Sequence, residues 1–142
     1  MRWMKQVNIW SIAILLCCVP PVAGASDNMD PLICAVQETI DCAFQQACLS
    51  GEAEGLNLPV IFSVNFKEKI IEARHGDGTI QETKIEHLKV LPDQLVLQGF
   101  EKRAWNLTIY KPDHRFSGSA IEPDALLGMF GACTVQESMR PQ

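Results

Sequence analysis

The sequence contains few of the residues and motifs that enzymes use for chemistry. Only three residues are histidines, His75, His87 and His114, and none lies close to a cysteine in the sequence. The chain has no C-x-x-C pair of the thioredoxin type and no short cysteine spacing of the kind that binds zinc. The G-x-S-x-G elbow of serine hydrolases is also absent. We therefore predict no catalytic residue, no metal site and no cofactor.

The sequence also lacks an excess of positive charge and a long hydrophobic run. Its 12 basic and 17 acidic residues give a net charge of −5, which argues against nucleic acid or anionic lipid as a partner. The apolar run from Val7 to Val19 is about a dozen residues long, whereas a membrane helix needs roughly 20. We expect no stable insertion into a membrane and no nucleic-acid partner.

Residues 1–25 have the features of a secretory signal peptide. Two basic residues precede the apolar run, and the small residues that follow it fit the A-x-A cleavage rule, with the cut before Ser26. Cleavage there would remove two basic residues and no acidic one, leaving a single domain, residues 26–142, with a formal charge of −7. We predict a periplasmic or secreted protein.

Four cysteines remain after the leader, and their even number in an oxidising compartment favours two disulfides. A straight helix over the Cys-rich segment 33–48 would place Cys42 and Cys48 about 9 Å apart, and Cys34 and Cys42 about 12 Å apart. Both distances exceed the limit of roughly 7 Å between bridged Cα atoms. Any full pairing joins two of these three cysteines, so the segment cannot be one unbroken helix. Of the three possible pairings we favour Cys34–Cys133 with Cys42–Cys48.

The start of the Cys-rich segment fits two structures. Asp30 can cap a helix, Pro31 suits its first position, and apolar residues recur at every fourth position from Leu32 to Ile40. The residues from Cys34 to Cys42 also alternate in the way that one face of a strand does. Because Ala, Gln and Glu favour helix, we predict a short helix here.

Residues 58–135 have the pattern of consecutive short strands. Apolar residues alternate with polar ones in PVIFSVNF and AWNLTIY, and Asp77-Gly78 is a strong hairpin signal. A phase slip between Ile85 and Leu88 indicates a bulge or a break. The spacing has no room for βαβ units, so we predict a mainly β fold. It would be one antiparallel meander of six or seven strands, closed as a small barrel or a sandwich, with residues 136–142 as a tail.

Four segments outside the leader carry a further signal: DCAFQQAC, LNLPVIFSVNFKEK, LVLQGFEKRAWNLTIY and FGACT. They resemble a group of small exported proteobacterial proteins of unknown function. That group has a Cys-rich N-terminal segment, an L-P-x-F strand, an L-Q-G…R-x-W strand pair and a terminal F-G-x-C. The resemblance implies export and a single β domain, and adds no catalytic residue. One departure is AFQQA between Cys42 and Cys48, where the group often has glycine.

Trp105, the sole tryptophan after the leader, is the first of the residues that we expect to point inward from its strand. Such a residue either plugs one end of a small barrel or lines a pocket. Arg103 is a turn charge unless it folds over the indole ring. With Phe62 and Phe66 from another strand, these residues are our candidate ligand-binding residues. We expect His75 and His114 to be solvated turn residues.

Three functions follow, in order of preference. The first is a non-catalytic binding or interaction module of the cell envelope, which recognises a partner protein through a sheet face, an edge or its loops. The second is a carrier of a small apolar ligand, which requires a cavity of at least about 300 Å³. The third is a small hydrolytic enzyme with His87 as its base, which requires a carboxylate within about 3.2 Å of the imidazole.

Overall fold

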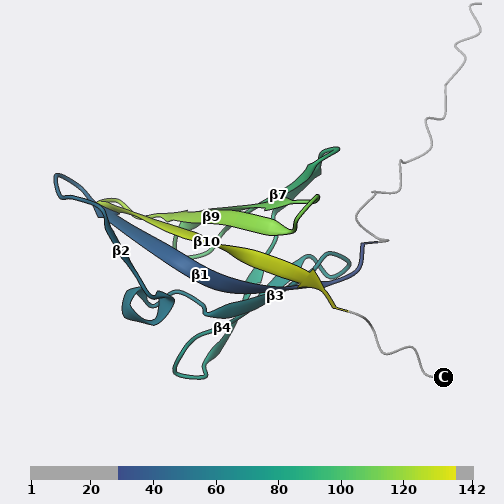
Figure 1. The fold of residues 1–142 in the computed structure, drawn as a ribbon, viewed down its shortest axis with the longest axis horizontal. Helices are drawn as coiled ribbons and strands as arrows, with labels where there is room; N and C mark the ends of the chain where they lie inside the picture. The colour runs from purple at the N-terminus through teal and green to yellow at the C-terminus, as the bar shows by residue number, and fades with distance from the viewer. Residues whose placement is uncertain (1–28, 137–142) are drawn as a thin grey trace, which may run out of the picture.

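The computed structural model describes residues 29–136, which form ten β-strands and one short 3₁₀ helix (Figure 1). The predicted leader and residues 137–142 of the predicted tail lie outside the described residues. Within residues 29–136, no helix has the length and hydrophobicity that crossing a membrane requires. The elements in chain order are β1 (Leu32–Ala43), β2 (Leu49–Gly51), η1 (Ala53–Leu56), β3 (Ile61–Asn65), β4 (Ile70–Arg74), β5 (Ile80–Lys84), β6 (His87–Val90), β7 (Gln94–Phe100), β8 (Ala104–Tyr110), β9 (Arg115–Ile121) and β10 (Ala125–Val135).

All ten strands belong to one sheet, and each pairs antiparallel with its neighbours. The order is β5-β4-β3-β1-β10-β9-β8-β7-β6, with β2 paired to β1 beside this path. Figure 1 shows the sheet strongly curled rather than flat. The prediction of a mainly β, antiparallel fold is confirmed, although the sheet is a curled half-barrel and has ten strands instead of six or seven.

The two ends of this strand order, β5 and β6, follow each other in the chain and are separated only by Ile85 and Glu86. Ile85 is buried, and its N–H donates to the Lys69 carbonyl at 2.8 Å. The N–H of Glu86 donates to the Gln98 carbonyl at 2.9 Å, on the other half of the sheet. The chain therefore turns a corner at these two residues, where the sequence shows its phase slip, and links both edges of the curl.

The predicted N-terminal helix is wrong, because Leu32–Ala43 forms the long strand β1. This strand lies between β3 and β10 and pairs with β10 along its whole length. The register shifts between Val36 and Glu38, so that the inward position moves from Cys34 to Thr39. A bulge of this kind breaks the alternation, and the remaining pattern matches a helical repeat. Pairing on both sides then outweighs the modest helix propensity of single residues.

The core fills the inside of the curl. Its main cluster contains buried residues from β1, β3, β4, β7, β8, β9 and β10, and Phe62 meets Phe116 edge to face with ring centroids 5.1 Å apart. The disulfide between Cys34 and Cys133 lies in this cluster, with both residues buried and opposite each other in register. It joins β1 to β10 and is the pairing that we favoured from the sequence. The second disulfide, Cys42–Cys48, closes the loop from β1 to β2.

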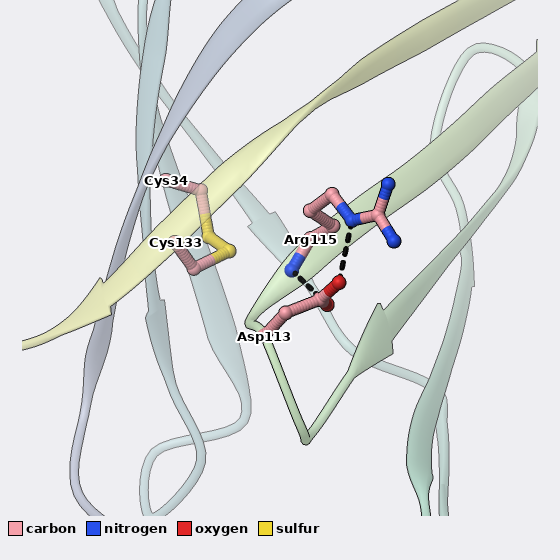
Figure 2. The surroundings of a disulfide bond; sticks show 4 residues. All are labelled: Cys34, Asp113, Arg115 and Cys133. Carbon is pink, nitrogen blue, oxygen red and sulfur yellow. Dashed lines mark hydrogen bonds and ion pairs between the residues drawn. A yellow bond between two sulfur atoms is a disulfide. The ribbon is translucent and has the colours of Figure 1, made fainter.

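The β8–β9 turn is fixed beside the buried disulfide (Figure 2). His114 adopts a left-handed backbone conformation, with φ of 55°, and its carbonyl accepts the N–H of Cys133 at 2.8 Å. Asp113 accepts the backbone N–H of Arg115 at 3.1 Å and the guanidinium Nε–H of the same residue at 2.6 Å. These hydrogen bonds, the backbone one first, lower the pKa of the Asp113 carboxyl.

Arg115→Ala is expected to raise the pKa of Asp113 towards its ordinary value, since the side-chain hydrogen bond and the nearby charge are lost. The rise is partial because the backbone hydrogen bond remains. A carboxyl with a lowered folded-state pKa stabilises the fold above its ordinary pKa of about 3.9, and this contribution disappears as the pH falls through the lowered value. NMR titration of the side-chain carboxyl carbons measures the shift.

Asp77 provides the internal control for this titration. Its pKa is also lowered, but by hydrogen bonds from Thr79, of which the side-chain bond comes first. The substitution at position 115 should therefore leave the titration of Asp77 unchanged. An Asp113 curve that does not move in the variant would contradict the assigned cause.

Candidate functional site

A cavity of about 210 Å³ lies inside the curl of the sheet. One wall comes from β3 and β4, including Phe62 and Ile71, and the facing wall comes from β8 and β10, including Leu107 and Met129. The strand register explains the first wall, since Phe62, Ala73 and Gln81 are direct partners across β3, β4 and β5. Side chains of directly paired residues share one face of a sheet, so this row points into the cavity.

Polar residues surround the opening of the cavity, which we call the mouth. It is formed by His75 in the β4–β5 turn, by Gln81 on β5 and by residues 101–103 in the β7–β8 turn. The Gln81 side-chain amide donates to the Glu101 carboxylate at 2.6 Å. This hydrogen bond connects β5, at one end of the strand order, to the β7–β8 turn across the mouth.

Trp105 lies in the cavity wall because its cross-strand partner is a glycine. Gly99 on β7 stands directly opposite Trp105 on β8. A Cβ atom at Gly99 would come within 2.5 Å of the indole Cε2 and within 2.6 Å of the Lys84 carbonyl oxygen. The missing side chain is therefore what lets the indole lie across β7, and this is the physical basis of the L-Q-G…R-x-W pattern in the sequence.

Two ring nitrogens at the cavity are buried and have no hydrogen-bond partner among residues 29–136. They are Trp105 Nε1 and His75 Nδ1, and both residues line the cavity. Nearly all buried polar atoms in folded proteins have a partner, so exceptions require an explanation. The indole N–H can only donate, whereas His75 Nδ1 donates or accepts according to the ring tautomer. Both nitrogens are covered by protein atoms, so neither is exposed to the cavity.

The structure brings three of the four predicted ligand-binding residues together. Trp105, Phe62 and Arg103 line the cavity, whereas Phe66 is buried in the core outside the lining. Arg103 does not fold over the indole ring, which was the alternative to a charged turn residue. Its Nη1 pairs with the Glu122 carboxylate at 2.8 Å instead.

Sequence reasoning missed His75, which the structure places at the cavity rather than in solvent. The hairpin around Asp77-Gly78 forms as predicted, with the N–H of His75 donating to Thr79 at 2.9 Å. The local sequence pattern does not show which face of this hairpin lies against the β7–β8 turn. Contacts between distant residues, such as the Gln81–Glu101 hydrogen bond, fix that position.

The geometry that a hydrolase centred on His87 requires is absent from the part of the chain that the structure describes. His87 lies on β6 opposite Gln98, is exposed, and is not part of the cavity lining. No ion pair or side-chain hydrogen bond of residues 29–136 involves its imidazole. Those same residues contain no group of three or more His, Cys, Asp or Glu side chains that could hold a metal ion.

The outer face of the sheet carries a row of exposed apolar side chains at one end. Phe100, Ala104, Ile121 and Leu126 are successive cross-strand partners on β7, β8, β9 and β10. The large members of this row are 69%, 53% and 43% exposed, for Phe100, Ile121 and Leu126 respectively. Recognition of a protein partner through a sheet face stays a prediction, and this row is an exposed apolar surface on such a face.

Comparisons with known proteins leave the site to be interpreted from its own geometry. No protein-family model, no curated protein and no solved structure matches this chain.

Proposed function

We propose that this protein is a non-catalytic binding module that acts outside the cytoplasm and holds a small molecule in the cavity of the half-barrel. The observation that carries the proposal is the cavity itself, about 210 Å³ in volume and lined by apolar residues such as Phe62, Ile71 and Leu107. The cavity combines this apolar lining with polar residues at its mouth, an arrangement typical of small-molecule sites.

The proposed compartment rests on sulfur chemistry. All four cysteines within residues 29–136 are paired in disulfides. Disulfides persist in the periplasm and the extracellular medium and are rare in the cytosol. A periplasmic or secreted protein fits this pairing, and the predicted signal peptide would deliver it there.

The cavity size limits the ligand. At about 210 Å³ it is smaller than the roughly 300 Å³ that we expected for a carrier of a small apolar ligand, so only a ligand smaller than a drug-sized molecule fits. An apolar cavity of about 150 Å³ is known to hold benzene. The cavity therefore fits a molecule of about one ring with a short substituent.

Ala73→Leu is expected to weaken binding of a small aromatic probe such as acetophenone at least tenfold, because the larger side chain fills the cavity. Ala73 is half-buried on β4 and lies between Phe62 and Gln81 in the inward row. Filling a cavity often stabilises a fold, so the melting temperature should stay the same or rise. Calorimetric titration measures binding, and differential scanning calorimetry measures stability.

Glu72→Leu is the matched control for this test. Glu72 lies in β4 directly before Ala73 and is exposed on the other face of the sheet. The control variant should bind the probe as the wild type does. Equal binding by the Ala73→Leu variant and the wild type would show that the cavity is not the binding site.

A further inference from the structure

The disulfide between Cys42 and Cys48 lies at the surface, unlike the bond between Cys34 and Cys133. Cys48 is exposed and Cys42 is half-buried. Cys34 and Cys133 are only 0% and 4% exposed. The surface bond is followed directly by β2, whose three residues are all exposed. Because exposed disulfides are the ones that thiols reach and reduce most readily, the two bonds differ in their accessibility to a reductant.

The chain that follows Cys48 forms one side of the cavity. This segment, residues 49–59, contains β2 and η1, and we call it the strap. Its last three residues line the cavity: Asn57, Leu58 and Pro59. Its Ala53 and Leu58 side chains are buried in a second apolar cluster, together with side chains of β9 and β10. A displacement of the strap would therefore remove part of the cavity wall.

Different contacts hold the two ends of the strap. After its C-terminal end, the N–H of Val60 donates to the Arg74 carbonyl at 2.9 Å, and the Val60 carbonyl accepts the N–H of Val36 at 3.0 Å. At its N-terminal end, β2 pairs with three residues of β1, and the buried Thr39 hydroxyl donates to the Gly51 carbonyl at 2.7 Å. The surface disulfide links this end covalently to β1. Without the bond, the N-terminal end keeps only this short pairing and the Thr39 hydrogen bond as its links to β1.

We propose that the Cys42–Cys48 bond is a redox-sensitive fastening of the strap, and that reduction by an exported dithiol protein loosens this wall of the cavity. A thiolate of the dithiol attacks the exposed Cys48 at Sγ and forms a mixed disulfide, and Cys42 leaves as a thiolate and takes up a proton. The second thiol of the dithiol then displaces Cys48, which also becomes a thiol. The reductant ends as a disulfide, and this chain has gained two electrons and two protons. The buried Cys34–Cys133 bond stays intact and keeps the sheet together.

The length of the closed loop sets the size of the effect. For a loop of this length, the chain-entropy relation corresponds to a change of about thirtyfold in an equilibrium constant. Reduction gives this freedom to the opened strap, so the strap opens more often. The inference rests on the proposed function in one respect, since a displaced wall weakens binding in the cavity.

The first test reduces the disulfide-bonded protein with dithiothreitol, a small dithiol, in the absence of denaturant. We expect the Cys42–Cys48 bond to be reduced at least about tenfold faster than the Cys34–Cys133 bond, because access limits the reaction. Alkylation at successive times, followed by peptide mass spectrometry, assigns the free thiols. Equal rates for the two bonds, or faster reduction of the buried one, would overturn the inference.

The second test measures amide hydrogen exchange in the double variant Cys42→Ala/Cys48→Ala, which imitates the reduced state and keeps the long bond. Amides of residues 49–59 should exchange at least about tenfold faster than in the wild type, whereas those of β8 and β9 should not change. Gln46→Ala is the matched control, since Gln46 is exposed in the same loop and this variant retains the disulfide. Unchanged exchange of the strap in the double variant would contradict the inference. The selectively reduced wild type gives the same measurement if the double variant does not fold.

Binding of acetophenone separates this inference from the proposed function. We expect the double variant to bind the probe at least about threefold more weakly than the wild type, because affinity falls with the fraction of molecules whose strap is in place. Faster exchange of the strap with unchanged affinity would show that the strap does not control the cavity, and the inference would be wrong. Failure of the oxidised wild type to bind the probe would overturn the proposed function, while the reduction and exchange experiments still decide whether the bond fastens the strap.

Discussion

Replacing Cys34 and Cys133 together by alanine is expected to lower the free energy of unfolding by about 4–5 kcal/mol. The disulfide closes a loop with a sequence separation of 99, and the loss of its constraint on the unfolded chain is worth about 4.7 kcal/mol for a loop of that size. Whole domains are stable by only about 5–15 kcal/mol. The variant should therefore unfold at much lower urea concentration, and a part of it should be unfolded at 37 °C.

The position of the bond adds to its effect. Cys34 and Cys133 are buried cross-strand partners on β1 and β10, the two strands at the centre of the sheet order. Without the bond, the N-terminal and C-terminal strands of the domain are held only by the backbone ladder and the core. Alanine is preferred to serine because a buried hydroxyl without a partner would add its own destabilisation.

The second disulfide is the matched control for this measurement. Cys42 and Cys48 are only six positions apart in sequence, and Cys48 is exposed. The same chain-entropy relation gives about 2 kcal/mol for a loop of this length. Urea unfolding of both double variants should show a loss about twice as large for Cys34/Cys133. Equal losses, or a larger loss for the short loop, would contradict the assigned role of the long bond as the main brace.

Some strands from β3 onward, such as β3 and β8, were predictable because each alternates on its own. Alternation needs only local sequence, and residues 61–65 and 104–110 show it without interruption. Residues 32–43 were not predictable in the same way, because the bulge between Val36 and Glu38 moves the inward position from one parity to the other. The strand pairing that decides the matter involves residues almost a hundred positions away, and no local pattern contains it.

The candidate site was predictable only in part for the same reason. Trp105 is identified by its place in an inward stripe, and Phe62 by the alternation of β3. Their meeting across the cavity, and the arrival of His75 at its mouth, depend on the curl of the whole sheet. The curl in turn depends on the corner at Ile85. The sequence marks this corner only by a slip in the apolar alternation, which does not show in which direction the chain turns. A single sequence thus yields the residues of a site more readily than their arrangement.

Gly131→Ala is expected to be the most damaging single methyl addition in the described part of the sheet, with a loss of about 3 kcal/mol or more in the free energy of unfolding. Gly131 on β10 is buried and stands opposite Val36 at the bulge of β1 and opposite Phe116 on β9. A Cβ atom there would overlap the Ala35 carbonyl oxygen and come within 2.7 Å of the Phe116 ring. A side chain can rotate away, but the carbonyl belongs to the central strand pair and moves only if the ladder moves.

Gly128→Ala tests whether this loss comes from the close approach or from glycine replacement in a strand. Gly128 is buried in the same strand, three residues earlier, and its nearest obstacle to a Cβ atom is the Ile40 Cβ at 3.8 Å. That distance is an ordinary contact, and alanine there also reduces the entropy of the unfolded chain. Urea unfolding should therefore show Gly128→Ala close to the wild type and Gly131→Ala far below it. Similar stabilities of the two variants would mean that β1 and β10 do not approach as closely at the bulge as the structure has them, and the terminal F-G-x-C pattern would lose its structural explanation.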